Sequence, residues 1–497
     1  MFDPFLHALP HVLSLPSITG MVVGMLAGLV IGALPGLTVV AGVALLIPLT
    51  FGMNPLAALG LMAGMYNGGS YGGAITAILL RIPGTPASVA TVFDGYPMTQ
   101  RGEAAYALQV AVVSGTVGSV LSALALMLLA PPLSRVTLLF GPAEYFWVAM
   151  FGMATVSMLL GDDPIKGLIS ACIGLLLGLV GQDQTTGTER FVFGSLHLLE
   201  GFSIVVLLTG LYAVPPVLLM AEHAAKTGIA QEALRLRRVK SVASEWTRYL
   251  RIWLRSSFIG IVIGILPGAG GSMTSLIAWN DARASSKDPA SFGKGNPEGI
   301  AASESGNGAD NAASLIPALT LGIPGSGVVA VILGGLLVHG LRPGPQLFRD
   351  HPDIVYGFML QMLFTALLLA VMGGLLATRI FGQVLRLPPL LLAPLILLMS
   401  VVGVYGINAS VFDVWVMLGI GLLGYAMDKL DFPTAPAVLG MLLGPMAENE
   451  LRLALTISMG DASVLFGSVA AWITIACTVL VFISPWLRKA MAARGTA

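Results

Sequence analysis

The chain has 497 residues, of which 56% are hydrophobic and only 10% are charged, and its formal net charge is zero. Soluble proteins carry about 25% charged residues, so this composition indicates a protein that crosses a membrane several times. The zero net charge provides no basic surface for nucleic acid, and the two cysteines, Cys172 and Cys477, suggest neither a disulfide framework nor a zinc site.

Apolar segments of different lengths follow one another along the whole chain. The first 16 residues contain no lysine or arginine, so we expect no cleaved signal peptide. A spanning helix needs about 20 apolar residues, or about 17 to 25 when it is tilted. By this criterion we expect helical segments near residues 18–34, 37–52, 55–66, 72–82, 104–131, 144–161, 164–181, 199–220, 252–266, 269–280, 312–321, 326–341, 354–378, 388–406, 411–427, 433–445 and 463–487. Several of them are too short to cross alone, which favours half-helices or re-entrant hairpins.

The first short segments surround a motif rich in glycine and proline. A ladder of glycines, Gly24, Gly28 and Gly32, leads into Leu-Pro-Gly-Leu-Thr at 34–38. The motif continues with Asn-Gly-Gly-Ser-Tyr-Gly-Gly at 67–73 and with Ile-Pro-Gly-Thr at 82–85. Glycine at every fourth position allows two membrane helices to approach closely, so we assign the ladder to packing and not to a binding site.

The same motif returns in the second half of the chain. Leu-Pro-Gly-Ala-Gly-Gly lies at 266–271, Asn-Gly-Ala-Asp-Asn at 307–311 and Ile-Pro-Gly-Ser at 323–326. The separation is 232 residues between Gly28 and Gly260, and 241 residues between Gly84 and Gly325 and between Arg101 and Arg342. The second copy therefore contains nine extra residues.

The duplication predicts an all-α polytopic membrane protein built from two repeated, inverted halves, with broken helices or re-entrant hairpins at the Pro-Gly motifs. We place the first membrane repeat at 1–221, a basic cytoplasmic linker at 222–251 and the second membrane repeat at 252–497. The linker is cytoplasmic by the positive-inside rule, and a surface helix in the headgroup region explains it better than a regulatory role does. By the same rule the N-terminus lies outside and the C-terminus inside, whereas a strict inverted duplication that starts outside would also end outside. An extra or re-entrant segment in one half has to resolve this conflict, and the sequence does not indicate which half contains it.

Motifs for catalysis are incomplete in this chain. The stretch 68–72 fits the G-x-S-x-G nucleophile elbow, with Ser70 as the nucleophile. A serine nucleophile also needs a general base, and neither His197 nor His339 has a carboxylate placed to orient it. The stretch 264–271 lacks the Lys-Ser/Thr of a P-loop. An enzyme is therefore not expected, and a serine hydrolase using Ser70 is kept only as a weak alternative.

Helix breaks at membrane depth are tolerated only where they are buried in protein or line a cavity. Matching breaks in two halves are the best pointer in a sequence to a transporter's binding site. Half-helix N-termini and free amides there attract anions, and hydroxyl and amide side chains add directed hydrogen bonds. On this basis the predicted substrate-binding residues are Pro35, Gly36, Thr38, Asn67, Gly68, Gly69, Ser70, Tyr71, Pro83, Gly84, Thr85, Pro267, Gly268, Gly270, Gly271, Ser272, Asn307, Asn311, Pro324, Gly325 and Ser326.

Asp310 is the one carboxylate inside the second motif. An acid at membrane depth is a functional candidate by default. A Na⁺ ion would be held by Asp310 together with backbone oxygens at Gly36, Gly268 and Gly308. The alternative is that Asp310 caps the N-terminus of a helix that begins near Ala312.

Three further features are interpreted from their positions alone. Arg81 adjoins the first break and is a candidate counter-charge for an anion. Tyr66, Tyr71 and Trp279 are more typical of packing or interface anchoring than of a pocket. Residues 280–304 are polar and are expected to form an aqueous loop between two half-helices.

Taken together, these motifs resemble the large membrane subunit of the tripartite tricarboxylate transporter family. The resemblance rests on residues 32–38, 66–73, 82–86, 94–97, 181–183, 187–190, 266–271, 304–312, 322–326, 340–345 and 448–452. It implies a multi-pass secondary transporter of the bacterial inner membrane. Its expected partners are a small membrane subunit, a periplasmic substrate-binding protein, a di- or tricarboxylate substrate and the lipid bilayer. No cofactor is implied beyond a coupling cation, Na⁺, and the alternative function is an uncoupled anion channel.

Overall fold

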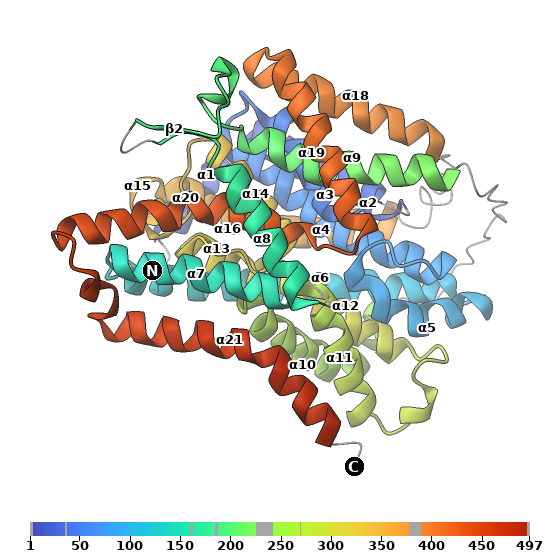
Figure 1. The fold of residues 1–497 in the computed structure, drawn as a ribbon. Helices are drawn as coiled ribbons and strands as arrows, with labels where there is room; N and C mark the ends of the chain where they lie inside the picture. Colours follow the sequence, from blue (N-terminus) through green and yellow to red (C-terminus); the bar gives the residue numbers. More distant parts are fainter. Residues whose placement is uncertain are drawn as a thin grey trace.

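The computed structural model describes residues 3–34, 37–159, 163–183, 187–224, 242–268, 270–376 and 389–494, and nearly all of them are helical (Figure 1). The first half contains α1 (Asp3–Val12), α2 (Leu15–Gly32), α3 (Val39–Thr50), α4 (Pro55–Leu80), η1 (Pro86–Ser88), α5 (Val89–Gln100), α6 (Ala104–Thr137), α7 (Pro142–Leu159), α8 (Pro164–Gly178), η2 (Leu196–Leu198) and α9 (Ile204–Ala224). Two short antiparallel strands, β1 (Gly181–Gln182) and β2 (Glu189–Arg190), pair between α8 and α9.

The second half begins with η3 (Val242–Glu245) and has the same all-helical character. It continues with α10 (Trp246–Ile265), α11 (Gly270–Ser285), η4 (Pro289–Ser291), α12 (Pro297–Ala313), α13 (Leu315–Leu321), α14 (Gly327–Val338), α15 (Pro345–Asp350), α16 (Pro352–Leu376), α18 (Pro389–Asn408), α19 (Val411–Lys429), α20 (Thr434–Ile457), η5 (Ala462–Phe466) and α21 (Val469–Arg494). Five helices in the described residues are long and apolar enough to cross a membrane: α2, α6, α9, α16 and α19. The expected all-α polytopic class is therefore confirmed. Residues 225–241 of the expected linker lie outside the described part of the chain.

The glycine ladder packs α2 directly against α4. A Cβ added at Gly20, Gly24, Gly28 or Gly32 would overlap the carbonyl oxygen of Ala57, Leu61, Met65 or Gly69, respectively. Each step of four residues along α2 is matched by the same step along α4, so the two helices run parallel. The packing role that the spacing predicted for the ladder is confirmed.

Equivalent contacts join α10 to α12 in the second half. A Cβ at Gly260 would meet the carbonyl oxygen of Gly306, and a Cβ at Gly264 would meet Asp310. The chain breaks match as well, because each begins at a left-handed residue, Arg81 (φ 62°) in one half and Gly322 (φ 75°) in the other. After each break the chain turns back, since Gly84 N–H donates to the Gly73 carbonyl at 3.3 Å and Gly325 N–H to the Ser314 carbonyl at 3.2 Å.

The expected break inside the Asn-Gly-rich motif of the first half is wrong. The segments expected at 55–66 and 72–82 form one continuous helix, α4, and residues 67–73 are fully helical and buried. Asn54 caps this helix by accepting a hydrogen bond from Leu56 N–H at 3.0 Å, and Pro55 occupies the first helical position. Glycine weakens an exposed helix, but here its absence of a side chain admits α2 and α3 to close contact.

Two faces of the molecule lie at opposite ends of these helices. One, the loop face, carries the end of α5 and residues 286–296, and the other, the strand face, carries β1, β2 and residues 340–345 (Figure 1). His339 Nε2 lies 3.2 Å from Thr50 Oγ1, so α14 and α3 end together on the strand face. α4, of about 39 Å at 1.5 Å per residue, and α5 then lead from there to the loop face. Helices α5 and α14 occupy the same position in the two repeats and end on opposite faces, which is what two inverted halves require. The inversion itself stays a prediction.

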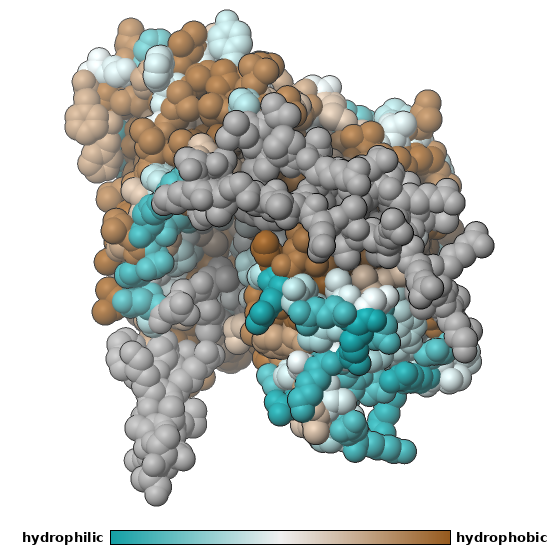
Figure 2. All heavy atoms as spheres, turned by 90° about the vertical axis from the view of Figure 1, so that its right-hand side faces the viewer, coloured by the Kyte–Doolittle hydropathy of each residue, from teal (hydrophilic) through white to brown (hydrophobic). Residues whose placement is uncertain are grey.

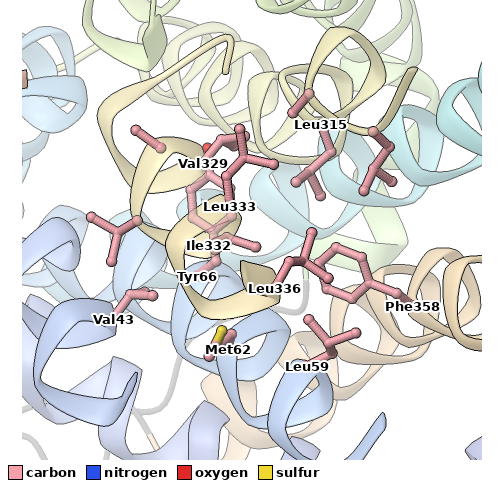
Figure 3. Packing of buried hydrophobic residues seen from close by; sticks show 14 of the residues in the cluster. Val43, Leu59, Met62, Tyr66, Leu315, Val329, Ile332, Leu333, Leu336 and Phe358 are labelled. Atoms are coloured by element: carbon pink, nitrogen blue, oxygen red, sulfur yellow. The ribbon is translucent and has the colours of Figure 1, made fainter. Parts of the chain in front are cut away.

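The main apolar core joins the two halves. Figure 3 shows α14 of the second half, with Val329, Ile332 and Leu336, packed over Met62 and Tyr66 of α4. Figure 2 shows the side of the molecule that carries the loop face, with a hydrophilic patch in the lower part of the view and apolar side chains in the upper part. The exposed basic residues of the loop face include Arg101, Arg283, Lys287 and Lys294.

Candidate functional site

A row of polar side chains on α12 lies at the centre of the molecule. Asn307, Asp310 and Asn311 are 2–3% exposed, and they follow one another at helical spacing on one side of α12. The helix begins where Asn296 accepts a hydrogen bond from Glu298 N–H at 2.9 Å, with Pro297 at its first position. Alanine, glycine and serine fill most of the remaining positions, so α6, α10 and α11 approach α12 closely.

Asn311 connects this row to α4 through side-chain hydrogen bonds. Ser70 Oγ donates to Asn311 Oδ1 at 3.0 Å, and Asn311 Nδ2 donates to Asn67 Oδ1 at 3.0 Å. Asn67 Nδ2 in turn donates to Thr365 Oγ1 on α16 at 2.9 Å. The predicted residues Asn67, Ser70 and Asn311 are therefore brought together. Thr365 was missed, because one hydroxyl in an apolar helix carries no signal.

Asp310 lies beside this network and has an unsatisfied oxygen. Its Oδ1 is buried and has no hydrogen-bond partner among the described residues. A Cβ at Gly271, in the first turn of α11, would lie 2.8 Å from Asn307 Oδ1 and 3.4 Å from Asp310 Oδ2. The carboxylate and the amide oxygen thus face the N-terminal turn of α11. A buried carboxylate without donors is costly unless a cation or another charge-compensating group is present.

The interpretation of Asp310 as a helix N-cap is wrong. Asp310 lies in the last turn of α12, and Ser314 N–H donates to its backbone carbonyl at 2.9 Å. The polar sequence 297–311 concealed a helix, because most of its polar side chains are buried against neighbouring helices. Gly308, proposed as a backbone ligand, lies within this helix and packs against Gly115 and Ser119 of α6. Its carbonyl is therefore part of helical backbone, not of a break.

The Pro-Gly break at Pro324-Gly325 adjoins the same region. Tyr66 Oη lies 3.3 Å from Ser314 Oγ and 3.2 Å from Ser326 Oγ, and all three hydroxyls are buried. Ser326 also caps α14 by accepting a hydrogen bond from Val329 N–H at 3.4 Å. The two breaks of the second half contact each other, since Gly268 N–H donates to the Gly325 carbonyl at 3.0 Å. Pro267, Gly268 and Pro324 are buried at this contact.

The Pro-Gly motifs of the first half reach the site only in part. Thr85 is 6% exposed and packs against Gly73, and Ala87 beyond it contacts the first turn of α11. Pro83 is exposed, whereas Thr38 caps α3 by accepting from Ala41 N–H at 3.2 Å. Pro35 and Gly36 lie outside the described residues.

Several other candidates point away from the central row. Gly68 packs against Met25 of α2 and Gly69 against Val39 of α3, while Tyr71 Oη donates to the Leu108 carbonyl of α6 at 3.3 Å. Arg81 is exposed, and its guanidinium lies 5.9 Å from the ring of Tyr96. These residues have packing or surface roles, and so Arg81 is not the counter-charge of a central site. Gly270 and Ser272 lie in the first turn of α11, where Ser272 is half-buried.

The expected aqueous loop at 280–304 is much shorter in the structure. α11 extends to Ser285 and α12 begins at Pro297, so only η4 and its neighbours connect them. Glu304 is 1% exposed and accepts a hydrogen bond from Thr91 Oγ1 of α5. Glu304 lies 241 residues after Ala63, a position that the sequence already placed in a helix, and this offset was the signal that could have located it.

A cavity of about 640 Å³ opens on the strand face. Its lining includes Leu321 and Gly322 at the second break, Leu333 and Leu337 of α14, and Arg342. At its rim, Asp183 and Glu448 pair with Arg190 and Arg452: Arg190 bonds Asp183 and lies 2.8 Å from Glu448, while Arg452 lies 2.9 Å from Asp183 and 2.7 Å from Glu448. The hydrogen bond from Arg190 lowers the pKa of Glu448 below its ordinary value. A second cavity, of about 710 Å³, lies between α7, α8 and α20, away from both breaks.

Comparisons with known proteins are consistent with this geometry. Residues 18–439 match the family described as the tripartite tricarboxylate transporter TctA family. The chain is 36% identical over 430 residues to an uncharacterised 52.8 kDa protein of the TAR-I ttuC' 3' region of Agrobacterium vitis, covering 85% of this chain and 84% of that protein. It is 38% identical over 205 residues to an uncharacterised protein of the TAR-II ttuC' 3' region of the same organism, covering 41% of this chain and 84% of that protein. No solved structure matches.

Proposed function

The chain belongs to the tripartite tricarboxylate transporter TctA family, and from this premise we propose that it is the large membrane subunit of a binding-protein-dependent carboxylate uptake system driven by Na⁺. The observation that carries the proposal is the buried polar row Asn307, Asp310 and Asn311, which lies beside the second break and the first turn of α11. Polar groups buried at membrane depth mark the path of a substrate or an ion.

The cation is proposed to bind between Asp310 and Asn307. Asp310 Oδ1 has no partner among the described residues, and the other carboxylate oxygen, Oδ2, lies with Asn307 Oδ1 beside Gly271. Hard cations are bound by carboxylate, amide and carbonyl oxygens. The described residues contain no cluster of three His, Cys, Asp or Glu side chains, so the remaining ligands are proposed to be neutral oxygens. Gly268 and Gly36 keep their place as proposed backbone ligands.

The carboxylate substrate is proposed to bind next to this cation, against amides and hydroxyls. Ser70, Asn311 and Ser326 supply hydrogen-bonding side chains, and the first turn of α11 supplies free backbone N–H groups. No described lysine or arginine makes an interaction with this row. The cation bound at Asp310 would therefore provide the positive charge that an anionic substrate needs, which couples the binding of the two solutes.

The orientation follows from the charges on the two faces. The loop face carries Arg101, Arg283, Lys287 and Lys294, and the start of α10 adds Arg248, Arg251 and Arg255, of which Arg248 and Arg255 pair with Glu298 and Asp281. The strand face carries Arg190, Arg342, Arg349 and Arg452. With more cations on the loop face, that face is proposed to be cytoplasmic by the positive-inside rule. The strand face, with its cavity, is then the side on which a periplasmic binding protein would deliver the carboxylate. The small membrane subunit is proposed to lie beside this chain in the bacterial inner membrane.

Uptake into proteoliposomes tests the proposal. The chain is reconstituted with its small membrane subunit, and the binding protein is added outside with radiolabelled citrate or malate. We expect accumulation above the external concentration only under an inward Na⁺ gradient, with loss of accumulation when monensin collapses that gradient. Flux that only equilibrates the two sides and ignores Na⁺ would identify an uncoupled channel and overturn the proposal.

A further inference from the structure

Asp94 of α5 is completely buried, and its carboxylate holds the segment between α11 and α12. Its Oδ1 accepts hydrogen bonds from the backbone N–H groups of Gly293, Gly295 and Asn296, at 2.8, 2.9 and 2.8 Å. Its Oδ2 accepts a hydrogen bond from Trp279 Nε1 of α11 at 2.8 Å. One charged side chain of the first half therefore binds four donors of the second half.

The rest of α5 adds contacts along the same line. Thr91 Oγ1 lies 3.0 Å from Ser303 Oγ and donates to Glu304 of α12. Arg101, just after the helix, donates to the carbonyls of Lys294 and Gly295, the latter at 2.8 Å. All of these partners lie in residues 293–304, which comprise the end of the loop-face segment 286–296 and the first two turns of α12.

This assembly covers the central row from the loop face. η1, which begins α5, packs on the first turn of α11, where a Cβ at Gly271 would lie 3.1 Å from Ala87 Cβ and 2.8 Å from Asn307 Oδ1. Ala87 therefore lies beside Asn307, and α5 runs from there to the loop face along α11 and α12. A solute leaving the row toward the loop face has to displace η1 and α5 from α11 and α12.

The equivalent position on the opposite face lacks such contacts. Arg342 lies 241 residues after Arg101, and it follows α14 as Arg101 follows α5. Arg342 is exposed, lines the cavity of about 640 Å³ and makes no hydrogen bond or ion pair with the described residues. Two arginines at the same repeat position therefore differ in their contacts: Arg101 donates to two backbone carbonyls, whereas Arg342 makes no such bond with the described residues.

We propose that α5 and residues 286–296 form a gate on the loop face, that Asp94 is the latch of this gate, and that the structure shows the gate closed. The inference rests on the proposed function, because only a transporter needs to expose one site to two faces in turn. Opening requires the four donors to leave the Asp94 carboxylate together. Asp94 is accordingly a positioning residue that touches neither substrate nor ion.

Cysteine accessibility in membrane vesicles tests the latch. Cys172 and Cys477 are replaced by serine, and Ala302→Cys is the reporter, because Ala302 of α12 is completely buried in the apolar cluster that contains Ala90 of α5. A charged, membrane-impermeant methanethiosulfonate is applied to inside-out and right-side-out vesicles. We expect Asp94→Ala to raise the labelling rate in inside-out vesicles by about tenfold or more, the factor that one hydrogen bond to a charged group represents. Labelling in right-side-out vesicles stays unchanged.

Two matched variants separate the latch from general loosening of the fold. Arg101→Ala removes the outer contacts and should raise labelling in the same direction, whereas Arg342→Ala removes no partner and should leave loop-face labelling unchanged. In Asp94→Asn the amide N–H₂ group lies against Trp279 Nε1, so two hydrogen-bond donors face each other and weaken the contact. Trp279→Phe removes one of these donors. The double variant Asp94→Asn with Trp279→Phe should therefore be labelled more slowly than Asp94→Asn alone. If the Asp94→Ala protein does not accumulate in the membrane, the labelling rate of Arg101→Ala provides the test of the gate instead.

The outcomes bear on the latch separately from the transport function. An unchanged labelling rate in Asp94→Ala and Arg101→Ala, or equal increases from both sides of the membrane, overturns the gate. Labelling needs neither citrate nor Na⁺, so a chain that labels as expected but fails to accumulate substrate contradicts only the proposed function. A chain that transports but shows no labelling change contradicts only the latch.

Discussion

Ser70 Oγ donates a hydrogen bond to Asn311 Oδ1 at 3.0 Å, and the two residues are 241 positions apart in the chain. This is also the separation between Gly84 and Gly325, so Ser70 and Asn311 are counterparts in the two repeats. Counterparts touch only where two repeats meet. The contact therefore places the polar row at the junction of the halves, where transporters built from repeats hold their solutes.

The first prediction concerns this contact. Ser70→Ala leaves Asn311 Oδ1 without its donor in a buried site, which should lower the free energy of unfolding by about 1–3 kcal/mol. Asn311→Ala should cost more, because Asn311 also donates to Asn67. The double variant should be less destabilised than the sum of the single variants, as measured by thermal unfolding in detergent.

Ser285→Ala, at the exposed end of α11, is the matched control and should change stability by less than about 0.5 kcal/mol. Additive effects of Ser70→Ala and Asn311→Ala would argue against the hydrogen bond. A serine-directed fluorophosphonate should not label Ser70, because Ser70 donates to an amide and not to a base.

Asp310→Asn tests the cation site. The amide keeps the shape of the side chain but removes its charge, so expression and thermal stability should stay near those of the wild type. The Na⁺ concentration that gives half-maximal uptake should rise about 10- to 150-fold, as for the loss of about 1.5–3 kcal/mol from one charged ligand. Asp353→Asn, an exposed acid in the first turn of α16, should leave the Na⁺ dependence unchanged. An unchanged Na⁺ dependence in Asp310→Asn would remove Asp310 from the site.

Gly325→Val should abolish uptake while the protein still inserts into the membrane. An added Cβ would lie 2.7 Å from the Gly264 carbonyl oxygen and 2.7 Å from Ser314 Cβ, so the break would be forced away from α10 and α12. Gly84→Val should act in the same way, against Gly32. Gly374→Val is the control, since no heavy atom lies within 4 Å of a Cβ there. Wild-type uptake by a folded Gly325→Val protein would show that the break geometry does not matter.

The ionic cluster on the strand face predicts a pH effect on stability. Arg190 lowers the pKa of Glu448 in the folded protein, so its stabilising contribution is present above the unfolded pKa of about 4.3 and is lost as the pH falls through the lower folded value. Glu448→Gln should therefore lower Tm at pH 7 and have a smaller effect near pH 3. Because the side chain of Glu448 is 29% exposed, each ion pair contributes only about 0.2–1 kcal/mol, and 1 M salt should reduce the difference. Glu103→Gln at the exposed start of α6 is the control, and an equal Tm loss at both pH values would contradict the assignment.

The sequence predicted the helical class and the breaks at Pro83-Gly84, Pro267-Gly268 and Pro324-Gly325 well, because the repeated Pro-Gly pairs interrupt apolar runs there. It failed where glycine and asparagine were read as loop formers. Residues 67–73 and 297–311 are polar or glycine-rich yet helical, since a neighbouring helix occupies the space that side chains would fill. Intrinsic propensity is overridden there by tertiary packing.

The candidate site was predicted in part. Asn67, Ser70 and Asn311 do meet, as matching breaks in two halves suggested, but Tyr71 and Arg81 face elsewhere. Spacing along one helix indicates which side chains share a face, but it does not indicate which neighbour that face meets. Asp94 illustrates the difference, since its four partners lie 185 to 202 residues away in the chain.

The parallel pairing of α2 with α4 also constrains how the chain is made. Gly24 of α2 contacts Leu61 of α4, which is synthesised 37 residues later. At about 5–20 residues per second, α2 waits roughly 2–7 s before its partner emerges from the ribosome. During that interval the glycine face of α2 meets lipid or the insertion machinery instead of α4. α3 then has to fold back beside a helix that has not yet found its partner, so the first half assembles within the membrane only after insertion of α4.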